Sequence, residues 1–198
     1  DIRIDGVRTA DDPRGVHLRL GYLSDTFGLY NALTVRQCLL HQAAMHGMDN
    51  AAQTAAADAA IERMKLGDLA KKRAGALSRG QRQRLAIGQA IVHGPKVLLL
   101  DEPASGLDPE ARWRLSSMLT DMARDGMTLI VSSHILSELE DYCTHVLALR
   151  GGKVILDAPV SAAVRELGAQ AGEDGAPAMA CIRIQLAAGS DFDLEKAL

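Results

Sequence analysis

The stretch Val97-Leu98-Leu99-Leu100-Asp101-Glu102-Pro103 determines the fold class that this sequence predicts. Its four consecutive apolar residues are typical of a strand that is buried on both faces, as in a parallel sheet. Two carboxylates follow at the carboxyl end of that strand, where open α/β sheets bind their ligands. There Asp101 can hold Mg²⁺, which prefers oxygen ligands, and Glu102 can accept a proton from an attacking water. The alternative is a strand that ends in an acidic turn without a function.

Strands and helices alternate along the chain after this stretch, as an α/β fold requires. Asp108 and Pro109 predict a helix start, because Asp caps helices and Pro fits their first turn, and Gly126 predicts its end. His134 follows the next strand at the same edge of the sheet, where a histidine can contact a phosphate or the attacking water, although a lone histidine is more often structural. The other elements predicted here are a strand over 127–131, a short helix capped by Ser133 with Ile135, Leu139 and Tyr142 or Cys143 facing inward, and a hairpin of 145–150 and 153–156 around Gly151-Gly152.

The region before the stretch is predicted to be helical from residue 34 to residue 73, since seven of the ten residues 51–60 are alanine and no proline interrupts it. Leu77-Ser78-Arg79-Gly80-Gln81 then opens another helix. The free N–H groups and the positive dipole end of such a helix start bind phosphate, and the Ser78 hydroxyl adds a donor. A helix start that serine merely caps is the commoner case.

Length and composition exclude several classes of protein. With 198 residues, of which 47% are hydrophobic and 24% charged, the chain is typical of one globular domain, with room for a small appendage. A net charge of −3 and an aromatic content of 3% argue against nucleic acid as the main partner. Three cysteines without a C-x-x-C pair argue against a disulfide framework or a zinc site and favour a reducing compartment. The longest run of Val, Ile and Leu has four residues, far below the ~20 that span a membrane, so we expect a soluble chain or one held at a membrane through a partner.

Four motifs, in this order and spacing, resemble the ATP-binding cassette (ABC) ATPase family over about Gly21 to Asp157: L-S-R-G-Q at 77–81, L-L-L-D-E-P at 98–103, S-G-L-D at 105–108 and S-S-H at 132–134. The wording E-P-A-S-G-L-D-P and S-S-H-I-L-S-E-L-E is most similar to ATPase subunits of bacterial ABC-2-type exporters. The resemblance implies an α/β fold with a P-loop NTPase-like core. Residues 1–157 would form a partial ABC ATPase domain with a helical signature subdomain at about 30–90, its N-terminal part missing. Residues 158–198 would form a linker, over 168–178, and part of a C-terminal accessory region.

The resemblance also implies a role for each candidate residue. Asp101 corresponds to the Walker B metal carboxylate, Glu102 to the general base and His134 to the switch histidine. Ser78, Arg79, Gly80 and Gln81 correspond to the signature loop, which contacts the γ-phosphate of ATP held by the other subunit, and Asp108 corresponds to the D-loop acid that crosses the dimer interface. Asp25 stands at the Q-loop, where the family usually has Gln, and Arg79 replaces a common Gly, which is expected to do little harm because its backbone donor remains.

The Walker A loop, G-x-x-x-x-G-K-S/T, does not occur in this sequence, whose only Gly-Lys pair is Gly152-Lys153, followed by Val154. Since the family carries that loop shortly before the matching region, Asp1 is expected to lie just after a lost Walker A strand and helix. This fragment alone is therefore expected to be inactive as an ATPase. The resemblance implies ATP and Mg²⁺ as cofactors, a second ATPase subunit in a head-to-tail dimer, transmembrane permease subunits as partners, and a cytoplasmic location on the inner face of the cell membrane.

The leading hypothesis is an ATP-hydrolysing subunit of an ABC transporter that couples dimer closure to transport, with export as the expected direction. One alternative is a non-transport ABC ATPase that acts on nucleic acid or the ribosome. Only a local cluster favours it, since residues 61–84 hold eight basic and two acidic side chains, and no nucleic acid is expected. A second alternative is a module that cannot hydrolyse ATP alone.

Overall fold

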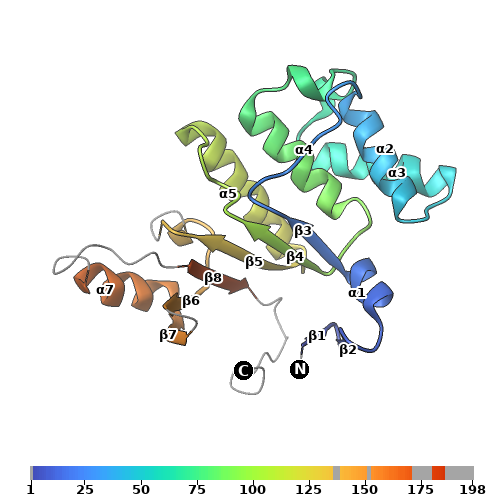
Figure 1. Ribbon diagram of the computed structural model, residues 1–198. Helices are drawn as coiled ribbons and strands as arrows, with labels where there is room; N and C mark the ends of the chain where they lie inside the picture. Colours follow the sequence, from blue (N-terminus) through green and yellow to red (C-terminus); the bar gives the residue numbers. More distant parts are fainter. Residues whose placement is uncertain (1, 136–138, 151–152, 171–179, 186–198) are drawn as a thin grey trace.

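The computed structural model describes residues 2–135, 139–150, 153–170 and 180–185. Its centre is a six-stranded sheet in the order β3-β4-β5-β8-β6-β7 (Figure 1). Strands β3 (Leu20–Leu23), β4 (Val97–Asp101) and β5 (Thr128–Ser133) are parallel neighbours. Strand β8 (Ala180–Gln185) pairs antiparallel with β5 and with β6 (His145–Arg150), and β7 (Lys153–Pro159) pairs antiparallel with β6. The parallel half confirms the predicted α/β class.

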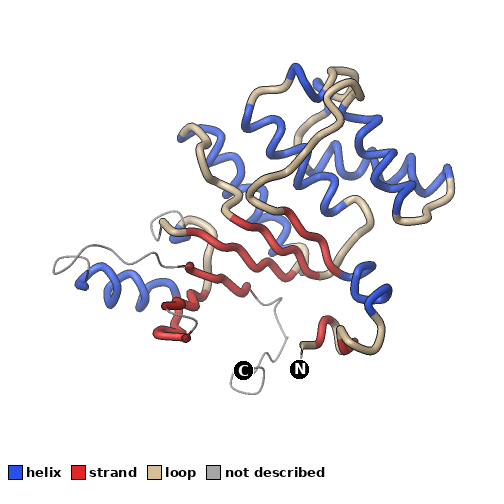
Figure 2. The backbone as a smooth tube through the Cα atoms, viewed as in Figure 1, coloured by secondary structure: helices blue, strands red, loops and turns tan. Residues whose placement is uncertain are grey.

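The helices form two groups around this sheet. In Figure 1, α2 to α4 lie together at the upper right, whereas α7 lies with β6 and β7 at the lower left. Figure 2 shows the long loop of residues 24–34 running from the end of β3 to the first group. The helices are α1 (Pro13–Arg19), α2 (Val35–Met45), α3 (Asn50–Arg63), α4 (Arg79–Ile91), α5 (Pro109–Arg124) and α7 (Val160–Gln170), with short 3₁₀ turns η1 (Gly67–Leu69) and η2 (Ala74–Ala76) and a small hairpin of β1 (Arg3–Ile4) and β2 (Val7–Arg8).

The core lies where the parallel strands meet α4 and α5. Leu98 of β4 and Leu129 of β5 are fully buried, as is Leu85 of α4. Leu115 and Leu119 of α5 are almost fully buried, on the apolar stripe that their spacing of four residues produces. This packing fixes both helix starts relative to the carboxyl edge of the sheet.

The prediction of one helical region over 34–73 is wrong in its continuity. The chain turns between α2 and α3 at Gly47, whose φ of +77° suits glycine, and Asp49 caps α3 by accepting a hydrogen bond from the Ala52 N–H at 2.9 Å. Only short 3₁₀ turns follow Arg63 before α4. The helical subdomain thus consists of separate helices that pack on one another.

Three smaller predictions are corrected or limited. Ile135, predicted to face inward, is 38% exposed, whereas Leu139, Tyr142 and Cys143 are buried as predicted. The start of the predicted linker is helical, because α7 continues to Gln170. The rest of that linker and the Gly151-Gly152 turn lie outside the described residues.

The expected accessory region contributes a strand to the main sheet. Strand β8 belongs to residues 158–198 and pairs with two strands of the predicted ATPase domain. The domain boundary at residue 157 stays a prediction. No helix in the described part of the chain has both the length and the apolar character that crossing a bilayer needs.

Candidate functional site

The ends of β4 and β5 bring three site residues into direct contact. The parallel register pairs Asp101 with Ser132. The Ser132 hydroxyl donates to Asp101 Oδ1 at 2.5 Å and accepts the Glu102 N–H at 3.0 Å. One serine therefore fixes a side chain and a backbone group of consecutive acidic residues.

Glu102 adopts an unusual backbone conformation, with a φ of +47°. A residue with a side chain pays a steric cost in this left-handed region, and such strain clusters at functional sites. The carboxylate points to His134, whose Nδ1 lies 2.9 Å from both Oε1 and Oε2. Glu102 has 24% of its side chain exposed and His134 has 61%, so solvent reaches the pair. Glu102 and His134, predicted from separate motifs, thus meet at the carboxyl edge of the sheet.

The predicted signature residues form the first turn of α4. The Ser78 hydroxyl accepts the Gln81 N–H at 3.3 Å, and the Gln81 side chain accepts the Ser78 N–H at 3.0 Å, which completes a capping box. A Cβ built on Gly80 would lie 2.9 Å from the Ala111 Cβ, so glycine permits the close approach of α4 to α5. The serine cap that the sequence left open as the commoner alternative is present, and phosphate binding at this turn stays a prediction.

Asp108 also has a local role, as the N-cap of α5. Its Oδ1 accepts the Ala111 N–H at 2.8 Å, as the Asp-Pro pair predicted. The predicted part of Asp108 at a dimer interface remains untested by a single chain.

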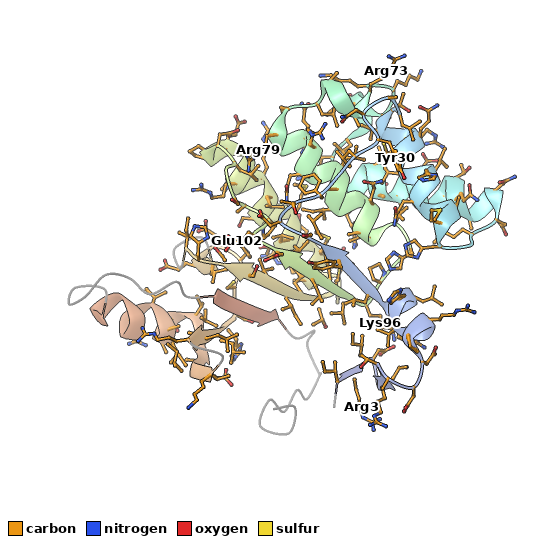
Figure 3. All side chains as sticks on the ribbon, viewed as in Figure 1. Arg3, Tyr30, Arg73, Arg79, Lys96 and Glu102 are labelled. Carbon is orange, nitrogen blue, oxygen red and sulfur yellow. The ribbon has the colours of Figure 1, made fainter. Side chains whose placement is uncertain are left out.

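The remaining candidate residues line two separate hollows on the protein. The larger, of about 640 Å³, contains Asp25 with Arg79 and Glu102, and Figure 3 labels the last two. The smaller, of about 170 Å³, contains the cap residues of both helices. The larger is lined by Asp25, Thr26, Phe27, Gly28, Arg79, Arg82, Gln83, Glu102 and Ser105, and the smaller by Ser78, Gly80, Gln81, Arg84, Asp108, Glu110, Ala111 and Arg114. One chain therefore presents two distinct sets of candidate residues.

Asp101 is the residue of this site whose chemistry fits a magnesium ion. No group of three or more His, Cys, Asp and Glu side chains suited to a metal occurs within the described residues. Mg²⁺ commonly takes one or two carboxylates and completes its shell with water and phosphate oxygens. Asp101, oriented by Ser132, fits such a role.

Sequence reasoning gave no role to Ser132 or to the side chain of Arg79. Ser132 was noted only as part of the S-S-H motif, and pairing the ends of the two buried strands would have placed it opposite Asp101. For Arg79 the sequence predicts a backbone donor and a place in the basic cluster at 61–84, whereas in the structure its Nη2 donates to the Ser105 carbonyl at 2.9 Å. Nothing in the spacing of the motifs indicates that contact.

Comparison with known proteins identifies the family. Residues 1–105 match the family model for ABC transporters. This chain belongs to the ABC transporter family. It is 31% identical over 155 residues to the ABC transporter ATP-binding protein NatA of Bacillus subtilis (strain 168), covering 78% of this chain and 63% of NatA. It is 37% identical over 153 residues to the phosphonates import ATP-binding protein PhnC 2 of Pseudomonas savastanoi pv. phaseolicola, covering 73% of this chain and 55% of PhnC 2.

A solved structure supports the same assignment. CbiO1 from Clostridium perfringens, described as part of the ABC transporter complex CbiONQ, matches with a TM-score of 0.76 at 26% identity. The match covers 84% of this chain and 68% of CbiO1. The P-loop NTPase-like fold of the ABC ATPases is thereby confirmed. The expected export direction has no support among these relatives, one of which is named for import, and this ABC chain spans less than two thirds of NatA and PhnC 2.

Proposed function

We propose that this ABC chain is the part of an ATP-binding transporter subunit that activates water for ATP hydrolysis. The observation behind the proposal is the contact of Glu102 with His134 beside Asp101 at the carboxyl edge of the sheet. Glu102 accepts the proton of the attacking water, and His134 orients the carboxylate. Bound Mg²⁺ would offset charge that develops on the phosphate oxygens, with Asp101 as its protein ligand.

A dimer accounts for the two separate hollows. The larger hollow, with Asp25 and Glu102, serves the nucleotide of its own chain. The smaller hollow, with Ser78, Gly80 and Asp108, faces the nucleotide of a second subunit. A γ-phosphate attracts the positive end of α4 of the second subunit. Hydrolysis removes that attraction, so the two subunits move apart after the reaction. Permease subunits in the membrane use this motion for transport. The protein therefore binds them from the cytoplasmic side. The mechanism fits transport in either direction.

Residues 1–198 hold no phosphate cradle of the form G-x-x-x-x-G-K-S/T. That loop supplies backbone donors, a lysine and a hydroxyl ligand for Mg²⁺. We expect residues 1–198 alone to bind ATP weakly and to turn none over. We expect a chain that combines such a loop with these residues to hydrolyse ATP.

Glu102→Gln in the complete protein tests the proposal. The amide keeps the shape of the side chain but cannot take the proton, so turnover with Mg²⁺ and ATP is expected to fall below detection while an ATP-bound dimer accumulates. Phosphate release and light scattering after size-exclusion chromatography measure the two effects. Glu62→Gln, the same change on an exposed position of α3, is the matched control. Unchanged turnover in Glu102→Gln would contradict the assignment.

The basic cluster at 61–84 gives little support to the nucleic-acid alternative. Four of its eight basic side chains donate to groups within the chain. These are Arg63 to Asp125, Arg79 to Ser105, Arg82 to Asn31 and Arg84 to Met64. Such cations are less available to phosphates, and we expect no binding to RNA or DNA at low salt.

A further inference from the structure

We propose that Arg79 is a positioning residue whose guanidinium fastens the loop after Glu102 to the tip of α4. Arg79 thereby fixes the position of the larger hollow relative to the smaller hollow of the same chain. The inference rests on the proposed function, because it concerns how Glu102 and the α4 tip act together.

The guanidinium of Arg79 occupies a defined place on that loop. Its Nη2 donates to the Ser105 carbonyl at 2.9 Å. A Cβ built on Gly106 would lie 2.5 Å from the guanidinium carbon and 2.5 Å from Nη2. Arg79 therefore fills the space that any side chain at position 106 would need. Gly106 also has a φ of +65°, which suits glycine.

The loop that Arg79 contacts is short and internally bonded. The Ser105 N–H donates to the Glu102 carbonyl at 3.0 Å, and the Leu107 N–H donates to the Ala104 carbonyl at 3.2 Å. Leu107 is buried, and Asp108 directly after it caps α5. Restraining Ser105 therefore also restrains the position of Glu102 before it and of Asp108 after it.

The next turn of α4 is attached elsewhere. Arg82 lies three residues after Arg79, on the same face of the helix. Its Nη1 donates to Asn31 Oδ1 at 2.9 Å and to the Ala74 carbonyl at 3.1 Å. Arg82 thus connects α4 to the loop of residues 24–34 and to η2, whereas Arg79 connects α4 to the loop after Glu102. When the loop after Glu102 shifts, the contact with Arg79 moves the first turn of α4, which Ser78 caps.

Steady-state kinetics of the complete protein distinguish positioning from nucleotide binding. For Arg79→Gly we expect kcat to fall by about 10- to 100-fold with KM for ATP nearly unchanged, the size of effect that small misplacement of a reacting group produces. Arg79→Lys keeps the charge but not the planar fork, so its kcat should be intermediate. An increase in KM with kcat unchanged would show that Arg79 binds nucleotide and would overturn the proposal.

Gly106→Ala tests the same contact from the other side. The added methyl displaces the guanidinium, so kcat is expected to fall as in Arg79→Gly. Gly94→Ala is the matched control, because Gly94 has a similar φ of +68° but nothing within 4 Å of a built Cβ. In the Arg79→Gly background, Gly106→Ala should cost no more than Gly94→Ala does, since the conflict with the guanidinium is gone and only the strain of the positive φ remains. Additive losses in the double variant would overturn the proposal.

Urea midpoints of the same four proteins test the contact without turnover. Non-additive shifts in the midpoint are expected for the Arg79 and Gly106 pair, and additive shifts would contradict the contact. If the unmodified protein hydrolyses no ATP, the proposed function fails, while the midpoint cycle still decides whether Arg79 fastens the loop.

Discussion

Ser132→Ala is the most direct test of how the paired carboxylates are held. The variant removes the hydroxyl that donates to Asp101 Oδ1 at 2.5 Å and accepts the Glu102 N–H at 3.0 Å. A hydrogen bond to a charged group contributes about 1.5–3 kcal/mol, and leaving a half-buried N–H without its acceptor costs about 1 kcal/mol more. We therefore expect the free energy of unfolding to fall by about 2–4 kcal/mol. For a chain of this size that corresponds to a Tm lower by roughly 5–15 °C.

A double-mutant cycle isolates the contact from other effects of the substitution. Unfolding by urea is measured for the unmodified protein, Ser132→Ala, Asp101→Ala and the double variant, and the expected coupling is about 1 kcal/mol or more. Ser161→Ala, on an exposed position of α7, is the control and should change stability by less than about 0.5 kcal/mol. A coupling below about 0.5 kcal/mol would refute the account of Ser132 as the residue that holds Asp101.

Three further predictions concern packing, protonation and the cradle. Gly21→Ala should cost about 1–3 kcal/mol in urea unfolding, because its Cβ would lie 2.4 Å from the Ala90 carbonyl, whereas Gly28→Ala, with nothing within 4 Å, should be neutral; equal effects would contradict the packing. Burial holds the pKa of His46 below its ordinary value, so the unfolded chain binds more protons and stability is lost as pH falls below about 6.5. His46→Phe keeps a ring against His93, which stacks at 3.9 Å, and should make the loss between about pH 7 and pH 5.5 shallower; an unchanged slope would contradict this. Residues 1–198 alone should release no phosphate from ATP, and measurable release would show that a G-x-x-x-x-G-K-S/T loop is dispensable.

Local signals were sufficient where neighbouring residues alone determine the structure. Asp108 and Pro109 predicted the start of α5, because a cap and a fixed φ need no distant partner. The apolar run before Asp101 predicted β4, but the strand is fully buried on one face only, since Leu98 and Leu100 are buried whereas Val97 and Leu99 are half-buried.

Local signals gave a wrong prediction where a strong helix propensity concealed a weaker turn signal. The alanines of α3 favour helix so strongly that residues 34–73 appeared continuous, although Gly47 and Asp49 carry the turn and the cap that divide α2 from α3. Ile135 is predicted to face inward from helical spacing, but it is 38% exposed.

The site itself depends on strand neighbours that the sequence does not specify. The pairing of β4 with β5 places Ser132 beside Asp101, and only then can His134 reach Glu102. In this arrangement Glu102 has a left-handed backbone, with a φ of +47°. A glycine at position 102 would adopt that φ without the cost of about 1–3 kcal/mol that a side chain incurs there. Since glycine would relieve the strain but remove the carboxylate, a glutamate in this conformation indicates that the carboxylate, and not the turn, is what the position requires.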